Sequence, residues 1–302
     1  MTIATAQLPE VAEVEGAVAA ARTLLERARA GSPASIYRAV YAGGWRGDGV
    51  PPDEGAPEAP MDTRFIEAVT AGVGERLFGP HWTVDSVAGD RAILSRHGVR
   101  AVAPANELDR PPEVGRSVRV PMPAVSASRL PGFVHRVGGA PKPPLSRIYV
   151  HLRPDAARWL LASYGPELAR RGVAYEMKAL AHPGNYFRGD AGVVMVSSAD
   201  VHRIAEHLAS VAGPGRLAGS PVRLLLTEQV APGVAIADQP DDQDPSGATS
   251  HGMWVTQVLQ WAADRSDGHG RDGAEMVSRR LVALGRSPTS PWKRGSGQER
   301  SG

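Results

Sequence analysis

Three short apolar segments in the second half of the chain constrain the fold most. They read RIYVHL at residues 147–152, VAYEMKAL at 173–180 and GVVMV at 192–196. Alternating or continuous apolar runs of this length are typical of β-strands. A helical pattern at 154–170 separates the first two segments, and another at 198–211 follows the third, so we expect one sheet covered by helices in an α+β or α/β domain. The pattern further predicts a strand at 222–226, a loop at 232–250, and helices at 253–263 and 274–284.

The first half has a different pattern. It predicts a helix at 10–30, a short helical turn at 36–40 and a helix at 63–73, with an acidic, Pro- and Gly-rich loop at 47–60. Residues 82–121 form short segments in which apolar and polar residues alternate, a pattern that predicts an antiparallel meander. The proline-rich segment 122–145 predicts an irregular crossover. We therefore expect an α+β protein with two domains. Residues 1–140 would form helices and a small sheet that bind a peptide or partner. Residues 141–302 would form an α/β-like domain.

Composition excludes several classes of site and function. The 302 residues carry a net charge of only +2, and no basic stripe indicates nucleic-acid binding. There is no cysteine, which excludes disulfides and thiolate chemistry. The nine histidines form no HxH or HxxxH pair, so we expect no metal site. No apolar run reaches the roughly 20 residues of a membrane span, and no signal-peptide pattern is seen, so we expect a cytoplasmic protein.

Lysine is rare in this arginine-rich chain, occurring only at Lys142, Lys178 and Lys293. A lysine can lose its proton and act as a base, whereas an arginine effectively cannot. Lys178 lies in the second predicted strand beside Glu176, both on the face opposite Met177. That polar face predicts either a solvated surface or part of a site.

Two further segments carry candidate site residues. The first predicted strand places Arg147, Tyr149 and His151 on one face, which is either an exposed row or one wall of an anion site. Arg188 precedes the third strand and could equally form a salt bridge with Asp190.

The order and spacing of these segments resemble a known family. The resemblance runs from about Phe65 to Ser296. It includes WTVDSVAGDRAILSRHGVRAV, RIYVHL, GVAYEMKALAHPGNYFRGDAGVVMV, SHGMW and SPWKRGS. The chain resembles the Hop-type type III effector family, which also supplies the lyase component of class V lanthipeptide and thioamitide biosynthesis. It more distantly resembles the phosphothreonine lyases of the OspF and SpvC type.

The resemblance implies a lyase that eliminates phosphate from phosphoserine or phosphothreonine of a precursor peptide phosphorylated by a separate kinase. Lys178 would be the base, and either Tyr149 or His151 the acid, with His135 an outside candidate. The phosphate would be bound by arginines, namely Arg147, Arg188 and Arg271. This elimination requires no metal or organic cofactor, and from the composition we expect neither nucleic acid nor a membrane as a partner. A host-directed effector remains a further possibility.

The alternative is a catalytically degenerate partner that binds the leader peptide or the kinase. It is motivated by Glu228 and Val255, which stand where the family pattern tends to have basic residues. For a lyase, we expect Lys178 to be at least half buried and within reach of Tyr149 or His151 across an adjacent strand. We also expect Arg147 and Arg188 to converge on one pocket, because burial and nearby cations favour a neutral lysine.

Overall fold

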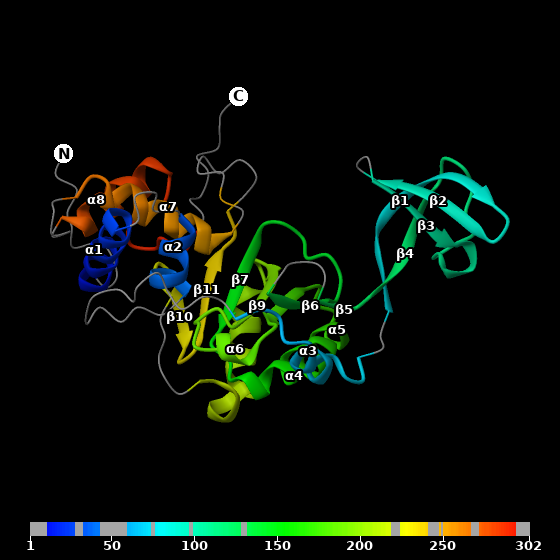
Figure 1. Cartoon of the computed structure of the whole chain (residues 1–302), viewed down its shortest axis with the longest axis horizontal. Helices are drawn as coiled ribbons and strands as arrows, with labels where there is room; N and C mark the ends of the chain where they lie inside the picture. Colours follow the sequence, from blue (N-terminus) through cyan, green and yellow to red (C-terminus); the bar gives the residue numbers. More distant parts are fainter. Residues whose placement is uncertain are drawn as a thin grey trace.

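Two antiparallel sheets organise the computed structural model, which describes residues 11–27, 33–42, 59–73, 76–96, 99–127, 132–218, 224–240, 248, 250–266 and 272–293. The smaller sheet has the order β3-β2-β1-β4. Its strands are β1 (Arg76–Ala88), β2 (Arg91–Arg96), β3 (Val99–Pro104) and β4 (Ser117–Pro123). It lies at one end of the long axis of the molecule (Figure 1). This sheet confirms the predicted meander.

The larger sheet has seven strands in the order β10-β11-β7-β9-β8-β6-β5. Its strands are β5 (Val125–Ser126), β6 (Phe133–Val137), β7 (Leu145–Val150), β8 (Glu176–Leu180), β9 (Gly192–Ser197), β10 (Glu228–Ala231) and β11 (Val234–Asp238). All its neighbouring strands pair antiparallel. Of the two alternatives that the sequence left open, the α+β class is therefore confirmed.

Helices cover both faces of the larger sheet (Figure 1). One face packs against η4 (Pro154–Ala156), α4 (Ala157–Trp159), η5 (Leu160–Tyr164), α5 (Gly165–Arg170) and α6 (Val201–Arg216). The other face packs against α1 (Val11–Arg27), α2 (Pro33–Ile36), η2 (Tyr37–Ala42), α7 (His251–Ala263) and α8 (Gly273–Ala283). Helix α3 (Thr63–Thr70) lies beside α4 and η5, and η3 (Ala105–Glu107) belongs to the smaller sheet's region.

Successive side chains along a strand are directed to opposite faces of the sheet, so they belong to different hydrophobic clusters, one on each face. Ile148, Met177 and Val194 are directed toward α4, α5 and α6, and all three are buried. Tyr149 and Val193, one residue along, join the cluster made by α1, η2, α7 and α8. The sheet therefore separates two helical layers of different composition.

Three strand predictions were wrong. Strand β6 lies within the predicted crossover and β11 within the predicted loop. Both strands are short and flanked by prolines and glycines, which is why the sequence pattern did not indicate them. Pro232 and Gly233, the latter with φ 76°, turn the chain between β10 and β11. The described part of the strand predicted at 222–226 is instead a turn, in which Leu226 has φ 56° and packs into the helical cluster.

Residues before 140 contribute to several parts of the molecule. Helix α1 packs on α7 and α8, strands β1 to β4 form the smaller sheet with a core of its own, and β5 and β6 extend the larger sheet. The predicted division into domains 1–140 and 141–302 stays a prediction, and the N-terminal residues do not pack as one unit. No helix in the described ranges is long and apolar enough to cross a membrane.

Candidate functional site

A row of polar side chains crosses the middle of the larger sheet. In the strand register, Tyr149 on β7 stands opposite Val193 on β9, Val193 opposite Lys178 on β8, and Lys178 opposite His135 on β6. Strand β9 therefore lies between the strands of Tyr149 and Lys178, and the expectation that these strands are adjacent was wrong. Their backbones are separated by about 10 Å, two strand spacings. The small Val193 between them leaves space above the sheet.

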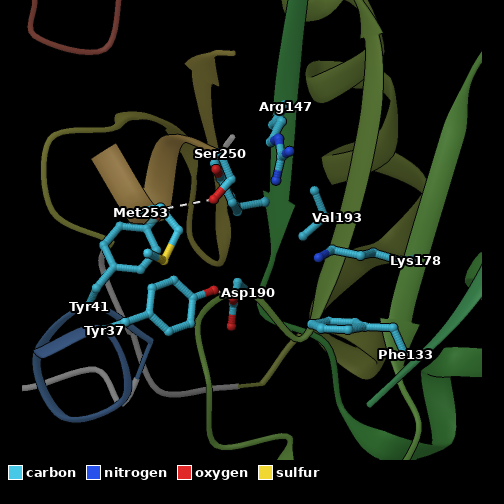
Figure 2. A pocket seen from close by; sticks show the side chains of 11 residues that line it. Tyr37, Tyr41, Phe133, Arg147, Lys178, Asp190, Val193, Ser250 and Met253 are labelled. Carbon is cyan, nitrogen blue, oxygen red and sulfur yellow. Dashed lines mark hydrogen bonds between the residues drawn. The ribbon is translucent and has the colours of Figure 1, made fainter. Parts of the chain in front are cut away.

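A cavity of about 300 Å³ fills that space. Its lining residues come from both the sheet and the helices over it: Tyr37, Tyr41, Phe133, Arg147, Tyr149, Lys178, Asp190, Val193, Ser250, Gly252 and Met253. Figure 2 shows Arg147 and Lys178 directed into this space from the sheet, with Ser250 and Met253 on its opposite side. The structure thus brings Arg147, Tyr149 and Lys178 together, as expected.

Lys178 is partly buried, which agrees with the expectation that it is at least half buried. Its Nζ lies 3.8 Å from the centroid of the Phe133 ring, a cation–π distance. The ring supports the lysine from below in Figure 2, and the amine extends into the cavity. The aromatic contact therefore fixes where the amino group can act.

Arg188 is buried and does not line the cavity. Its Nε donates to Asp190 Oδ1 at 2.8 Å and one terminal nitrogen donates to Oδ2 at 2.9 Å. Burial alone would raise the pKa of Asp190, but the charge and hydrogen bonds of Arg188, with help from Tyr37 and Lys178, hold it below its ordinary value. The predicted salt bridge with Asp190 is confirmed. A direct phosphate contact by Arg188 stays a prediction.

Asp190 also anchors the N-terminal helical segment to the site. Its Oδ2 accepts a hydrogen bond of 2.7 Å from the Tyr37 hydroxyl. The two residues are 153 positions apart, so this contact ties η2 to the loop before β9. Because Arg188 balances the charge of Asp190, the cations Arg147 and Lys178 dominate the lining of the cavity.

Tyr41 and Tyr149 line the cavity with hydroxyl groups that are buried. Neither hydroxyl makes a hydrogen bond of standard geometry to any residue that the structure describes. Burial raises the pKa of both phenols, and each also affects the other, so the two hydroxyls lie close together. Both tyrosines therefore keep their protons at neutral pH.

His251 lies behind these two tyrosines. Its ring centroid is 6.4 Å from that of Tyr41, 6.3 Å from that of Tyr149, and 5.5 Å from that of Trp254, on which it stacks. Burial, together with the charges of Arg286 and Arg147, lowers the pKa of His251 to about 3. His251 is therefore neutral at physiological pH.

The N-terminus of helix α7 completes the cavity. Ser250 caps the helix, its Oγ accepting a hydrogen bond of 3.3 Å from the Met253 N–H (Figure 2). Gly252 contacts both tyrosines of η2: a Cβ placed there would lie 2.6 Å from a Tyr41 ring atom and 2.7 Å from a Tyr37 ring atom. Helix N-termini favour anions, since their N–H groups and dipole are directed at the ligand.

The remaining predicted residues lie elsewhere. His151 is buried beyond the end of β7 and does not line the cavity. His135 has the sheet register described above but is not a lining residue either. Arg271 lies outside the described residues. Glu228 stands opposite Ile236 on the α6 side of the sheet, and Val255 is buried within α7, so neither departure from the family pattern faces the cavity.

Sequence reasoning missed five lining residues that carry polar or aromatic groups: Tyr37, Tyr41, Phe133, Asp190 and Ser250. A weak signal existed for the tyrosines, because Tyr37 lies in the helical turn predicted at 36–40, Tyr41 follows it four residues later, and only 6 tyrosines occur in the chain. No group of histidine and acidic residues in the described ranges could hold a metal ion.

The solved structures similar to this chain include two effector proteins. An effector protein from Pseudomonas syringae pv. syringae strain 61 is 14% identical, with a TM-score of 0.53, and the match covers 97% of this chain and 100% of that one. An effector protein from Pseudomonas syringae pv. tomato strain DC3000 is 17% identical, with a TM-score of 0.42, and the match covers 54% of this chain and 63% of that one. At these identities, the first match shows a shared fold alone.

No curated protein sequence significantly matches the chain. The model of the HopA1 effector protein family, in contrast, matches residues 126–291. This range contains β6 to β11 with α4 to α8, and hence every strand that lines the cavity. It is more than half of the 302 residues, and the chain belongs to the HopA1 effector protein family.

Proposed function

We propose that this protein is a lyase that eliminates phosphate from phosphoserine or phosphothreonine in a peptide, leaving dehydroalanine or dehydrobutyrine. The observation that carries the proposal is one cavity lined by Arg147, Lys178 and the N-terminus of α7. An arginine binds a phosphate through a planar pair of donors, and a helix N-terminus adds backbone donors. About 300 Å³ is at the lower end of the range for ligand pockets, which suits one phosphorylated side chain.

In this proposal, the neutral amine of Lys178 takes the proton from the substrate Cα. The electrons of the Cα–H bond form the Cα=Cβ double bond, and the Cβ–O bond breaks as phosphate leaves with its electron pair. Arg147 and the α7 N-terminus hold the phosphate and stabilise the charge that develops on it. The face of Phe133 fixes the direction from which Lys178 approaches the substrate.

Tyr149 supports the departing phosphate as a hydrogen-bond donor. The sequence left Tyr149 and His151 as equal candidates for this role, and of the two only Tyr149 lines the cavity. Burial raises the pKa of Tyr149, so its proton remains available at neutral pH.

The substrate that we propose is a ribosomal precursor peptide phosphorylated by a separate kinase. This part of the proposal rests on the sequence resemblance to the lyase component of class V lanthipeptide biosynthesis. A peptide substrate is compatible with the cavity, since a phosphorylated side chain on an extended chain can enter it.

The test is incubation of the protein with a phosphoserine peptide, followed by mass spectrometry. Elimination predicts a product lighter than the phosphopeptide by phosphoric acid, and the new alkene should add an external thiol. Hydrolysis would restore the hydroxyl and give no thiol adduct. Arg147→Leu should weaken binding of the phosphopeptide by about 10- to 100-fold, the range for a charge-assisted pair. Arg153→Leu is the matched control, because Arg153 is exposed and paired with Asp155.

Binding of the phosphopeptide without any release of phosphate would contradict the lyase. It would favour the alternative, a partner that holds the phosphorylated peptide for another enzyme. The same cations would then explain the binding, and Lys178 would act only as a charge.

A further inference from the structure

Two buried hydroxyl groups at the cavity make no hydrogen bond of standard geometry within the part of the chain that the structure describes. Tyr41 is 1% exposed and Tyr149 is 3% exposed, and both line the cavity. Neither hydroxyl makes a hydrogen bond of standard geometry to a described residue, although each lies close enough to affect the other and Tyr149 also lies close to Arg147. Leaving a buried donor unsatisfied is costly, and natural proteins rarely do so without a ligand or water to complete the bond. Tyr37 shows the contrast, because its hydroxyl donates to Asp190.

The two tyrosines come from opposite layers of the molecule. Tyr149 belongs to β7 in the middle of the sheet, whereas Tyr41 belongs to η2, a π-helical segment near the N-terminus. π-Helical segments are uncommon and often occur at functional sites. Gly252 permits the arrangement, since any side chain there would collide with the Tyr41 ring.

We propose that the hydroxyls of Tyr41 and Tyr149 form a donor pair for one phosphate oxygen of the substrate, which makes the η2 segment part of the substrate site. The inference rests on the proposed function of the cavity and names two of its phosphate-binding groups. Tyr41 lies outside residues 126–291, so the phosphate site includes a residue that the family match does not cover.

The chemistry of the ligand follows from the donors. Both phenols keep their protons at neutral pH, so both donate, and the ligand atom between them accepts. A phosphate oxygen accepts more than one hydrogen bond and carries negative charge. Arg147, on the same strand as Tyr149 and the same face, adds a cation to that site. A neutral amide ligand would use the tyrosines but gain little from Arg147.

The experiment measures binding of inorganic phosphate by calorimetry and elimination from a phosphoserine peptide, both on the full chain. Tyr41→Phe and Tyr149→Phe should each weaken phosphate binding by about tenfold, as expected for loss of one hydrogen bond to a charged acceptor. Tyr164→Phe is the matched control. Its hydroxyl is also buried, but it donates to the Ile204 carbonyl on the other side of the sheet and should leave phosphate binding within about twofold.

The outcomes separate this inference from the proposed function. If the unmodified protein releases phosphate from the peptide but Tyr41→Phe binds phosphate as tightly as the unmodified chain, the donor pair is wrong and the lyase stands. If the unmodified protein binds phosphate, loses affinity with Tyr41→Phe, and yet eliminates nothing, the donor pair stands and the lyase is wrong. A thermal midpoint for Tyr41→Phe near that of the unmodified chain shows that the variant is folded.

Discussion

The two faces of the seven-stranded sheet differ in what their side chains contact. On one face, Ile148, Met177 and Val194 are buried among the apolar side chains of α4, α5 and α6. On the other, Tyr149, Lys178 and their neighbours line a cavity under η2 and α7. The strands are the same, and the residues differ by one position in the chain.

This difference between the two faces indicates where the protein keeps polar groups that lower its stability. An unsatisfied buried hydroxyl costs about 1–3 kcal/mol. On the α6 face, the Tyr164 hydroxyl is satisfied by the Ile204 carbonyl. On the cavity face, the hydroxyls of Tyr41 and Tyr149 make no hydrogen bond of standard geometry in the described ranges. Costly polar arrangements cluster at ligand sites, which supports our proposal that the cavity face is the functional face.

Adjacent substitutions on β7 provide the largest expected contrast in stability. Ile148→Ala removes a side chain with no exposed surface from the apolar core and should lower the free energy of unfolding by about 3 kcal/mol. Tyr149→Phe removes a buried hydroxyl that makes no hydrogen bond of standard geometry, and should leave the free energy of unfolding unchanged or raise it. Chemical denaturation of both variants measures the difference. Equal losses would mean that the two faces do not differ in this way.

A smaller effect should appear in the pH dependence of stability. His251 has a pKa of about 3 in the folded protein and an ordinary value of 6.5 when unfolded. Between these values the unfolded state binds a proton that the folded state does not, so stability is complete above 6.5 and falls as pH decreases. We expect this histidine alone to remove about 2 kcal/mol between pH 6.5 and about pH 5.

His251→Phe keeps an aromatic ring on Trp254 and removes the titrating group. Its free energy of unfolding should therefore depend less steeply on pH over that range than that of the unmodified chain. His202→Gln is the control, because it also removes a histidine but at a side chain that is 53% exposed. If His251→Phe were as steep as the unmodified chain, His251 would not be the buried neutral group described here.

Much of the sheet could be predicted from the sequence. Alternation of apolar residues located β7 and β8, and a continuous apolar run located β9. Strands β6 and β11 could not be predicted in this way, because both are short and lie in segments rich in proline, glycine or acidic residues. The order of the strands could not be predicted either, since no local sequence pattern in β7 or β8 indicates that β9 lies between them.

The site was predictable only on the side that the sheet provides. Arg147, Tyr149 and Lys178 share a face because strand alternation places them there. Tyr37, Tyr41 and Asp190 enter the site through contacts between distant segments, which no local pattern encodes. Arg188 could be interpreted as a phosphate ligand or as a partner of Asp190, and only the folded structure shows the ion pair.

The most direct test of the lyase separates binding from elimination at Lys178. The account predicts that Lys178→Ala binds the phosphoserine peptide within a few-fold of the unmodified chain but releases phosphate at least about 1,000-fold more slowly, because the amine acts on the substrate Cα proton in the transition state. Lys178→Arg should be nearly as slow, since a guanidinium keeps its proton. Lys142→Ala, at an exposed lysine, should behave as the unmodified chain. Phosphate release by Lys178→Ala at the unmodified rate would contradict the account.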